Sequence, residues 1–414
     1  MPKSRKKPHP IEQKIAAAQS YNFFVEQLKF FLRKAVGPSV FHLLPPAEVA
    51  RLYSIRNHAV RVQAAAGHTI PSRVLKSIKQ LATFFFTNTM VKVGIGELEE
   101  VSFRDYFSML FTLINYATML KEDAYKSAPQ VKQALSPFAS LADNPDQAEA
   151  WHDYETIKNL LACLHSATDD CFYAAGSDIK TYRTGNTGIG FCMELYSLPA
   201  IKINITLDGK SRPAYRVAWA KPAPSPHLEP VFITSDKLHL PGGRSFGLYI
   251  QTHALERLNE RMDGIDIGIL HFCLYLSCST PEFCKNRQGE RLLAYRLMDI
   301  KTGYFVVDIA HDKMVLRTFL FLTHNGTPEG ERLNDQLGLR KEDKAWLAID
   351  KLSTFLNSDI SSNTRLRQLF IHAGCEGLLS LERGVSFLLP LQPEKQVADF
   401  ITRYLQLGND KGIA

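Results

Sequence analysis

The spacing of apolar residues changes along this chain, and that change most constrains the fold. Up to about Gly176, apolar side chains recur at helical spacing, while proline, glycine and serine residues mark helix ends. The predicted helices are Ile11–Val36, Ala47–Ala66, Ser72–Val93, one capped by Ser102 that runs to about Leu120, and Trp151–Ala167. This pattern predicts a helical domain over residues 1–175, with Ser127–Gln147 as a looser connection.

Phenylalanines are unusually dense in this helical region. Their helical spacing favours the core of a helical bundle over a platform on which nucleic-acid bases stack. The residues are Phe23, Phe24, Phe30, Phe31, Phe84, Phe85, Phe86, Phe103, Phe107 and Phe111. Such a domain can also bury a helix of a protein partner, so a non-enzymatic scaffold or protein-interaction role is one functional alternative.

Strand patterns follow after about Gly176. Ala200–Leu207 and Ala214–Trp219 flank Asp208-Gly209, which predicts a β-hairpin. The glycine-rich stretch Thr184–Gly190 lacks both the spacing and the lysine of a phosphate-binding loop, which favours a simple turn over a ligand loop.

A regular order of elements occupies the centre of the chain. A strand at Phe246–Ile250 precedes a helix that Thr252 can cap and Gly264 ends, and a second helix follows at Asp266–Leu276. Three strands come next, at Leu292–Ile300, Tyr304–Ala310 and Lys313–Leu322, with turns at Lys301–Gly303 and His311-Asp312. Helices followed by an antiparallel meander predict an α+β domain over residues 181–335.

The last part of the chain returns to helical spacing. Helices are predicted at Glu342–Asn357, Thr364–Ala373 and Pro393–Leu407, with a short strand at Val385–Leu389. This gives a C-terminal helical segment over residues 340–414. A length of 414 residues exceeds what one hydrophobic core usually supports, so the predicted fold class is α+β and multidomain.

Charge permits a nucleic-acid partner without requiring one. The formal net charge is +7, from 49 Lys and Arg against 42 Asp and Glu. Part of this excess lies in the basic residues of Met1–Lys7, which form either a simple solvated tail or a phosphate-binding arm. No apolar run is long enough to predict a membrane span.

The seven cysteines argue against a secreted disulfide scaffold, because their number is odd and the chain is large. Cys273, Cys278 and Cys284 lie close together, yet no C-x2-C pair is present. Buried thiols are therefore favoured over a zinc site, and a reducing, cytoplasmic location is expected.

The segment Thr252–Asp263 carries the strongest chemical pattern. At helical spacing, His253, Arg257, Glu260 and Arg261 fall on one side, opposite a stripe of apolar residues. Guanidiniums can grip a phosphate diester in a forked manner, and an imidazole can move a proton near neutral pH. The alternative is a solvated helix face stabilised by pairs of opposite charge.

This helix and the meander after it resemble the small bacterial DUF4258 family. The resemblance covers residues 246–322 and is carried by His253-Ala254-x-x-Arg257-x-x-Glu260-Arg261. Members resemble the compact ribonuclease fold of BrnT and RelE-like toxins, in which a histidine and arginines on the helix and a Thr or Ser on a late strand handle an RNA phosphate. Arg317 and Thr318 are nearest to that late-strand position.

The resemblance implies RNA as partner and cleavage without a metal or cofactor. His253 would act as base or acid, and Arg257 and Arg261 would hold the phosphate. Arg317 would join them from the strand, Thr318 would donate a hydrogen bond, and Glu260 would orient a neighbour or carry a proton. Binding of RNA or DNA without cleavage is the second alternative.

Overall fold

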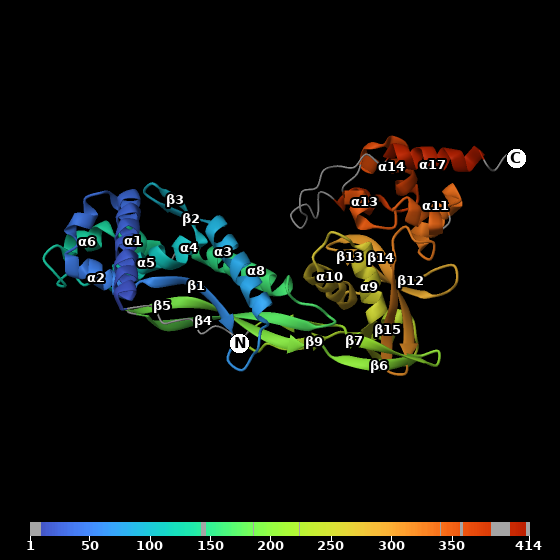
Figure 1. The fold of residues 1–414 in the computed structure, drawn as a ribbon, viewed down its shortest axis with the longest axis horizontal. Coiled ribbons are helices and arrows are strands. Elements are labelled where there is room, and N and C mark those ends of the chain that lie inside the picture. Colours follow the sequence, from blue (N-terminus) through green and yellow to red (C-terminus); the bar gives the residue numbers. More distant parts are fainter. Residues whose placement is uncertain are drawn as a thin grey trace. The chain divides into compact units, whose positions relative to one another are not determined.

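The computed structural model describes residues 10–141, 146–184, 186–222, 224–339, 341–356, 359–381 and 398–410. The chain divides into two compact units (Figure 1). Unit 1 comprises Met1–Ala162, Ala175–Tyr196 and Pro222–Pro224, and unit 2 comprises Cys163–Ala174, Ser197–Lys221 and Ser225–Ala414. Both units contain helices and strands, so the fold is mixed α+β, as the sequence predicts.

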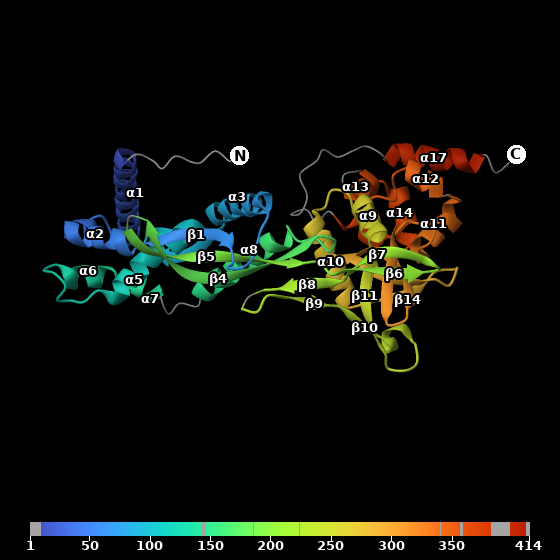
Figure 2. The same ribbon diagram turned by 60° about the horizontal axis from the view of Figure 1, so that its bottom comes forward.

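Unit 1 contains a small sheet with helices packed around it. The strand order is β1-β5-β4, in which β1 (Asn57–Ala64) is an edge strand parallel to β5 (Asn186–Pro199); β4 spans Cys171–Thr184. Both ribbon views place α3 beside β1 (Figures 1 and 2). The helices are α1 (Pro10–Val36), η1 (Val40–Leu43), α2 (Pro46–Ile55), α3 (Ser72–Asn88), α4 (Phe103–Asp105), η2 (Tyr106–Leu110), α5 (Phe111–Met119), α6 (Ala128–Ala134), α7 (Ser136–Ser140) and α8 (Asp146–Cys163).

The helix predicted at Ala47–Ala66 is wrong in its second half. The structure ends α2 at Ile55, and Arg56 adopts extended backbone angles from which β1 begins. The β-branched residues Val60 and Val62 favour a strand there. The looser connection predicted at Ser127–Gln147 likewise contains the short helices α6 and α7.

A β-hairpin replaces the end of another predicted helix. The sequence predicts a helix at Ser72–Val93, but α3 ends at Asn88 and β2 (Met90–Ile95) pairs with β3 (Leu98–Ser102). Strict alternation of exposed and buried residues in β2 is the strand signal that the prediction missed. At the hairpin turn, a Cβ on Gly96 would lie 2.2 Å from the carbonyl oxygen of Ala35, so the turn packs closely against the end of α1.

The predicted aromatic core is confirmed for half of its members, and Phe85 and Phe111 are half-buried. Phe24, Phe31 and Phe86 are buried, and Phe103 stacks on Phe107 at a ring separation of 5.7 Å. The prediction is wrong for the exposed residues Phe23, Phe30 and Phe84, because helical spacing alone does not show which face meets the core.

Unit 2 is built on one large sheet. Its strand order is β12-β13-β14-β15-β11-β7-β6, and β10 also pairs with β11. Only β11 and β15 of these described pairs run parallel. The bounds are β6 (Lys202–Leu207), β7 (Lys210–Arg216), β10 (Phe232–Thr234), β11 (Ser245–Gln251), β12 (Phe283–Lys285), β13 (Arg291–Leu297), β14 (Ile300–Ala310) and β15 (Lys313–Phe321); a separate hairpin pairs β8 (Ala218–Lys221) with β9 (His227–Pro230).

Two predicted turns are confirmed and one is wrong. Asp208-Gly209 joins β6 to β7 with both residues at positive φ, and His311 at φ 56° turns β14 into β15. The turn predicted at Lys301–Gly303 lies instead at Met298-Asp299. Gly303 belongs to β14, where a Cβ would lie 2.5 Å from the Phe319 ring, so this glycine serves close packing rather than a turn.

The predicted pair of helices is present as α9 (Thr252–Arg261) and α10 (Ile267–Ser279). Asp266 caps α10 by accepting a hydrogen bond from the Gly268 amide. The predicted Thr252 cap is wrong, because Thr252 is the first helical residue and Gln251 precedes it without a side-chain cap. The buried face of α9 shares one core with Met314 and Leu316 of β15.

The C-terminal helices belong to unit 2 and share the core of its sheet. The predicted helix Glu342–Asn357 is interrupted after Trp346, whereas Thr364–Ala373 corresponds to α14; Val385–Leu389 lies outside the described residues. The described elements are α11 (Pro328–Leu337), α12 (Lys341–Trp346), α13 (Leu352–Leu356), η5 (Asp359–Ser362), α14 (Thr364–His372), α15 (Glu376–Leu379) and α17 (Ala398–Asp410). Among the described residues, no helix is both long and apolar enough to cross a membrane.

The cysteines are free thiols. Cys273 and Cys278 are buried in α10, where burial raises the pKa of both thiols, and Cys284 is half-buried in β12. No cluster of three or more histidine, cysteine or carboxylate side chains suited to a metal occurs in the described ranges.

Candidate functional site

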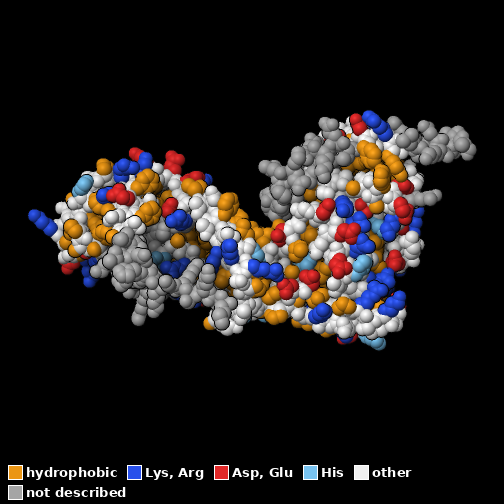
Figure 3. Space-filling model, in the orientation of Figure 1, with side chains coloured by type: hydrophobic (Ala, Val, Ile, Leu, Met, Phe, Trp, Pro, Cys, Tyr) orange, Lys and Arg blue, Asp and Glu red, His pale blue; other side chains and the backbone are white. Residues whose placement is uncertain are grey.

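The helix α9 carries four of the six predicted catalytic residues, and side chains of opposite charge already pair with most of these four. His253 has a side chain that is 48% exposed, and its Nδ1 lies 3.9 Å from Oε2 of Glu256. Arg257 donates from Nη1 to Oε2 of Glu260 at 2.5 Å. Figure 3 shows acidic and basic side chains interspersed over the part of unit 2 where Figure 1 draws α9.

Arg261 is used to hold the C-terminal region against α9. It donates a hydrogen bond to Asp350, and both side chains are mostly buried, with 18% and 11% of their surface exposed. Two residues after Arg261, the carboxylate of Asp263 accepts hydrogen bonds from the amide and the hydroxyl of Ser353, at 2.9 and 2.8 Å. The end of α9 is therefore an anchor for residues 350–353.

Arg317 lies away from the α9 face. It is the extra residue of a β-bulge, because Val306 pairs with Thr318 while Val307 pairs with Leu316. Its Nη2 donates to Glu290 at 3.1 Å, and its Nε lies 3.0 Å from Asp308 without hydrogen-bond alignment.

The partner Asp308 shows which face Arg317 occupies. Asp308 pairs with Val315, which packs with Ile205 and Ala214 rather than with the core beneath α9. Cross-strand partners share a face of the sheet, so Arg317 reaches the face opposite α9. Burial raises the pKa of Asp308, and the Arg317 guanidinium opposes that rise.

The structure thus brings His253, Arg257, Glu260 and Arg261 onto one helix and leaves Arg317 elsewhere. Thr318 is half-buried in β15 after the bulge, and no hydrogen bond links it to α9 within the described residues. A phosphate on α9 would have to compete with Glu260 for Arg257 and with Asp350 for Arg261. This arrangement suits a charge-paired helix face better than a site assembled around a phosphate.

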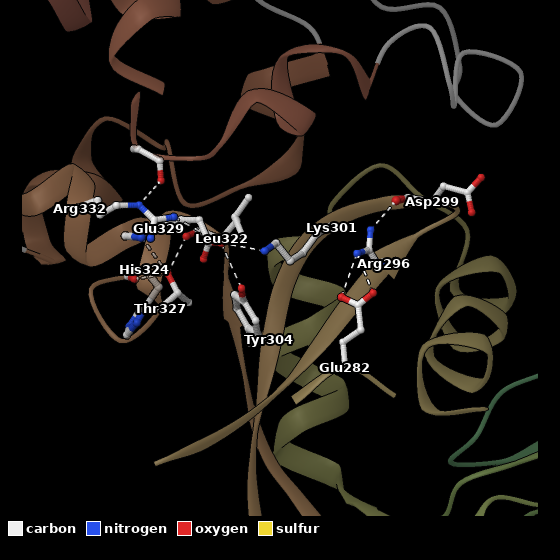
Figure 4. Close-up of polar contacts among 12 residues, drawn as sticks. Glu282, Arg296, Asp299, Lys301, Tyr304, Leu322, His324, Thr327, Glu329 and Arg332 are labelled. Carbon is white, nitrogen blue, oxygen red and sulfur yellow. Dashed lines mark hydrogen bonds and ion pairs between the residues drawn. The ribbon is translucent and has the colours of Figure 1, made fainter. Parts of the chain in front are cut away.

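A second polar cluster of unit 2 surrounds the buried carboxylate of Glu329. Figure 4 shows Lys301, Tyr304 and Arg332 converging on it. Its Oε1 accepts from Lys301 Nζ at 2.8 Å and from the Tyr304 hydroxyl at 3.1 Å. Because burial and the Glu329 charge both raise the pKa of Tyr304, the phenol stays protonated. These contacts join β14 to α11, which is a structural role.

Unit 1 contains a feature that the sequence reasoning missed, a groove along the free edge of β1. We call it the basic groove; it has a volume of about 660 Å³ and lies between β1 and α3. It is lined by residues 59–63 of β1, by Lys79, Ala82, Thr83, Phe86 and Thr87 of α3, and by Arg104. Within the described part of the chain, neither Lys79 nor Arg104 pairs with a carboxylate.

A smaller hollow, the aromatic pocket, adjoins the basic groove at Ala59 and Arg104 and has a volume of about 200 Å³. It is lined by Ser20, Phe23, Phe24 and Gln27 of α1, by residues 56–59, and by Arg104, Asp105, Ser108, Met109 and Thr112. The guanidinium of Arg56 lies over the Tyr53 ring, 3.6 Å from its centroid, and donates to the Tyr53 carbonyl oxygen.

Basic side chains gather at this junction. Burial lowers the pKa of His58, and the charges of Arg56 and Arg61 lower it further. The only carboxylate among the lining residues of the two hollows is Asp105, which accepts a hydrogen bond from the Ser102 hydroxyl at 2.9 Å. An anion is therefore favoured along the basic groove.

A sequence signal for this site existed in the segment Arg56–Ala64. Within it, Val60-Arg61-Val62-Gln63 alternates apolar and polar side chains, as a strand does, and Arg56, His58 and Arg61 are basic. Because the segment was predicted to be helical, this alternation was not recognised. No protein-family model, no curated protein and no solved structure matches this chain. The resemblance to the DUF4258 family remains a prediction from the α9 motif.

Proposed function

We propose that this protein binds RNA in the basic groove of unit 1, without cleaving it. The observation that carries the proposal is a groove lined by Arg61, Lys79 and Arg104, of which Lys79 and Arg104 have no carboxylate partner in the described part of the chain. Phosphate contacts from Lys and Arg supply most of the sequence-independent affinity for nucleic acid. The net charge of +7 is consistent with such a partner.

The edge position of β1 adds to this support. An edge strand presents backbone N–H groups that are not used by a neighbouring strand, and these groups can also donate to phosphate oxygens. By contrast, the guanidiniums on α9 are held by Glu260 and Asp350, so this face has fewer free donors to offer.

Fluorescence anisotropy with a labelled single-stranded RNA tests the proposal. The double variant Lys79→Ala/Arg104→Ala should bind at least about tenfold more weakly and should lower the slope of log affinity against log salt by about 1.4. Arg257→Ala is the matched control, since it removes a surface arginine of unit 2 and should leave affinity within about twofold.

The same samples report on cleavage. In the presence of a metal chelator, the RNA should be recovered intact after binding. An affinity that falls equally in the double variant and the control would overturn the groove proposal. Metal-independent cleavage that is lost in His253→Ala would instead establish the activity implied by the α9 resemblance.

A further inference from the structure

We propose that the basic groove selects single-stranded nucleic acid, and that one base leaves the stack and enters the aromatic pocket. This inference rests on the proposed function and names the class of ligand. It starts from the different chemistry of two hollows that share Ala59 and Arg104.

The aromatic pocket has the lining expected for a nucleobase. Phe23, Phe24 and Met109 supply apolar walls, while Gln27, Asn57 and Asp105 supply hydrogen-bonding groups. Single-stranded nucleic acids are recognised by stacking of splayed bases on aromatic rings and by hydrogen bonds to base edges. The basic groove offers cations instead, which suits the phosphate backbone.

The two hollows form one path along β1. Pairing of β1 with β5 is interrupted between His58 and Arg61, at the position of Ala59 where the hollows meet. Bulges of this kind re-aim side chains and often lie beside functional sites. A strand of nucleic acid can therefore follow the groove and turn one base into the pocket.

Size and charge both favour a single base over a duplex. A pocket of about 200 Å³ is smaller than the sites that hold drug-sized ligands, so a base pair cannot enter. Asp105 would repel a phosphate, yet a carboxylate accepts hydrogen bonds from an exocyclic amino group of a base. The single carboxylate thus lies where a base edge, not the backbone, is expected.

Phe23 is the residue on which the stacking depends. Its side chain is 61% exposed, although neighbouring aromatic residues such as Phe24 are buried. Phe84 on α3 is equally exposed, at 60%, and lines neither hollow. This pair provides a test residue and a matched control whose substitutions should both leave the fold intact.

The experiment compares a short single-stranded RNA with a duplex of the same sequence, measured by anisotropy on the full chain. Wild-type protein should prefer the single strand. Phe23→Ala should lower the single-strand affinity about tenfold and leave duplex affinity unchanged, Phe23→Tyr should restore it, and Phe84→Ala should have no effect. Equal affinity for both forms, or equal effects of the two alanine variants, would overturn the inference while leaving the proposed function intact.

Base identity and a peptide competitor complete the test. Oligo-C and oligo-A, whose bases carry an exocyclic amino group, should bind more tightly than oligo-U. Asp105→Asn should reduce this difference in affinity, because it removes the carboxylate that accepts a hydrogen bond from the amino group. If poly-glutamate displaces the labelled RNA as effectively as unlabelled RNA does, the inference is overturned in favour of an acidic peptide as the ligand. Absence of binding to every nucleic acid would instead refute the proposed function itself.

Discussion

At the scale of single residues, the chemistry of a side chain depends on what lies beside it more than on its type. Arg257 and Arg261 are four residues apart on α9, yet one forms an exposed pair with Glu260 and the other a mostly buried pair with Asp350. Arg317 has partners on the opposite face of its sheet. Sequence spacing predicted the shared face of α9 and its short-range pairs of opposite charge. It could not connect Arg261 to Asp350, which lies 89 residues later in the chain.

Buried histidines provide a prediction at this scale. His271 is fully buried, its Nδ1 accepts a hydrogen bond from the Thr168 amide at 2.9 Å, and burial lowers its pKa to about 4 against the opposing charge of Asp169. Between pH 6.5 and about 4 the unfolded chain binds a proton that the folded chain excludes, so stability falls as the pH falls. The full difference corresponds to about 3 kcal/mol.

Urea denaturation of wild type and His271→Asn across this pH range checks the prediction, because Asn keeps an acceptor but does not titrate. In the variant, the free energy of unfolding should change much less with pH between pH 6.5 and 4 than in wild type. Parallel curves for wild type and His271→Asn would contradict the account.

At the scale of elements, local sequence signals predicted some boundaries and missed others, such as the Thr252 cap and the Lys301–Gly303 turn. The Asp208-Gly209 turn and the Ser102 cap of α4 are present, because backbone conformation and capping involve near neighbours. The helix predicted at Ala47–Ala66 failed because apolar spacing is ambiguous in short segments. The β1 strand exists through its pairing with β5, more than a hundred residues later in the chain.

The anchor at the end of α9 gives a prediction for an element. Arg261→Ala leaves Asp350 mostly buried without its partner, which should lower the free energy of unfolding by about 1–3 kcal/mol. Arg257→Ala breaks only an exposed pair on the same helix and should cost less than about 0.5 kcal/mol.

Urea denaturation midpoints of the two variants measure this difference directly. The coupling energy between Arg261 and Asp350 follows from comparing the double variant Arg261→Ala/Asp350→Ala with the two single variants. We expect the double variant to be destabilised by less than the sum of the single variants. Equal, small effects of Arg257→Ala and Arg261→Ala would show that α9 does not anchor residues 350–353.

At the scale of the whole molecule, the mixed α+β class follows from composition and periodicity, whereas the location of a binding surface does not. The basic groove combines β1, α3 and α4, segments that are separated in sequence and that only tertiary packing brings together. The α9 motif is recognisable in the sequence because all of its charged groups lie within one short segment. A tertiary groove leaves no comparable pattern in a single sequence.

The central claim is that RNA occupies the basic groove of unit 1 rather than the α9 face of unit 2. Ultraviolet crosslinking of a 4-thiouridine-labelled single-stranded RNA, followed by mass spectrometry of the crosslinked peptides, tests it most directly. The account predicts crosslinks within β1, α3 and residues 103–110, and their loss in Lys79→Ala/Arg104→Ala. Crosslinks confined to α9 and the strands beside it, unchanged in that variant, would contradict it.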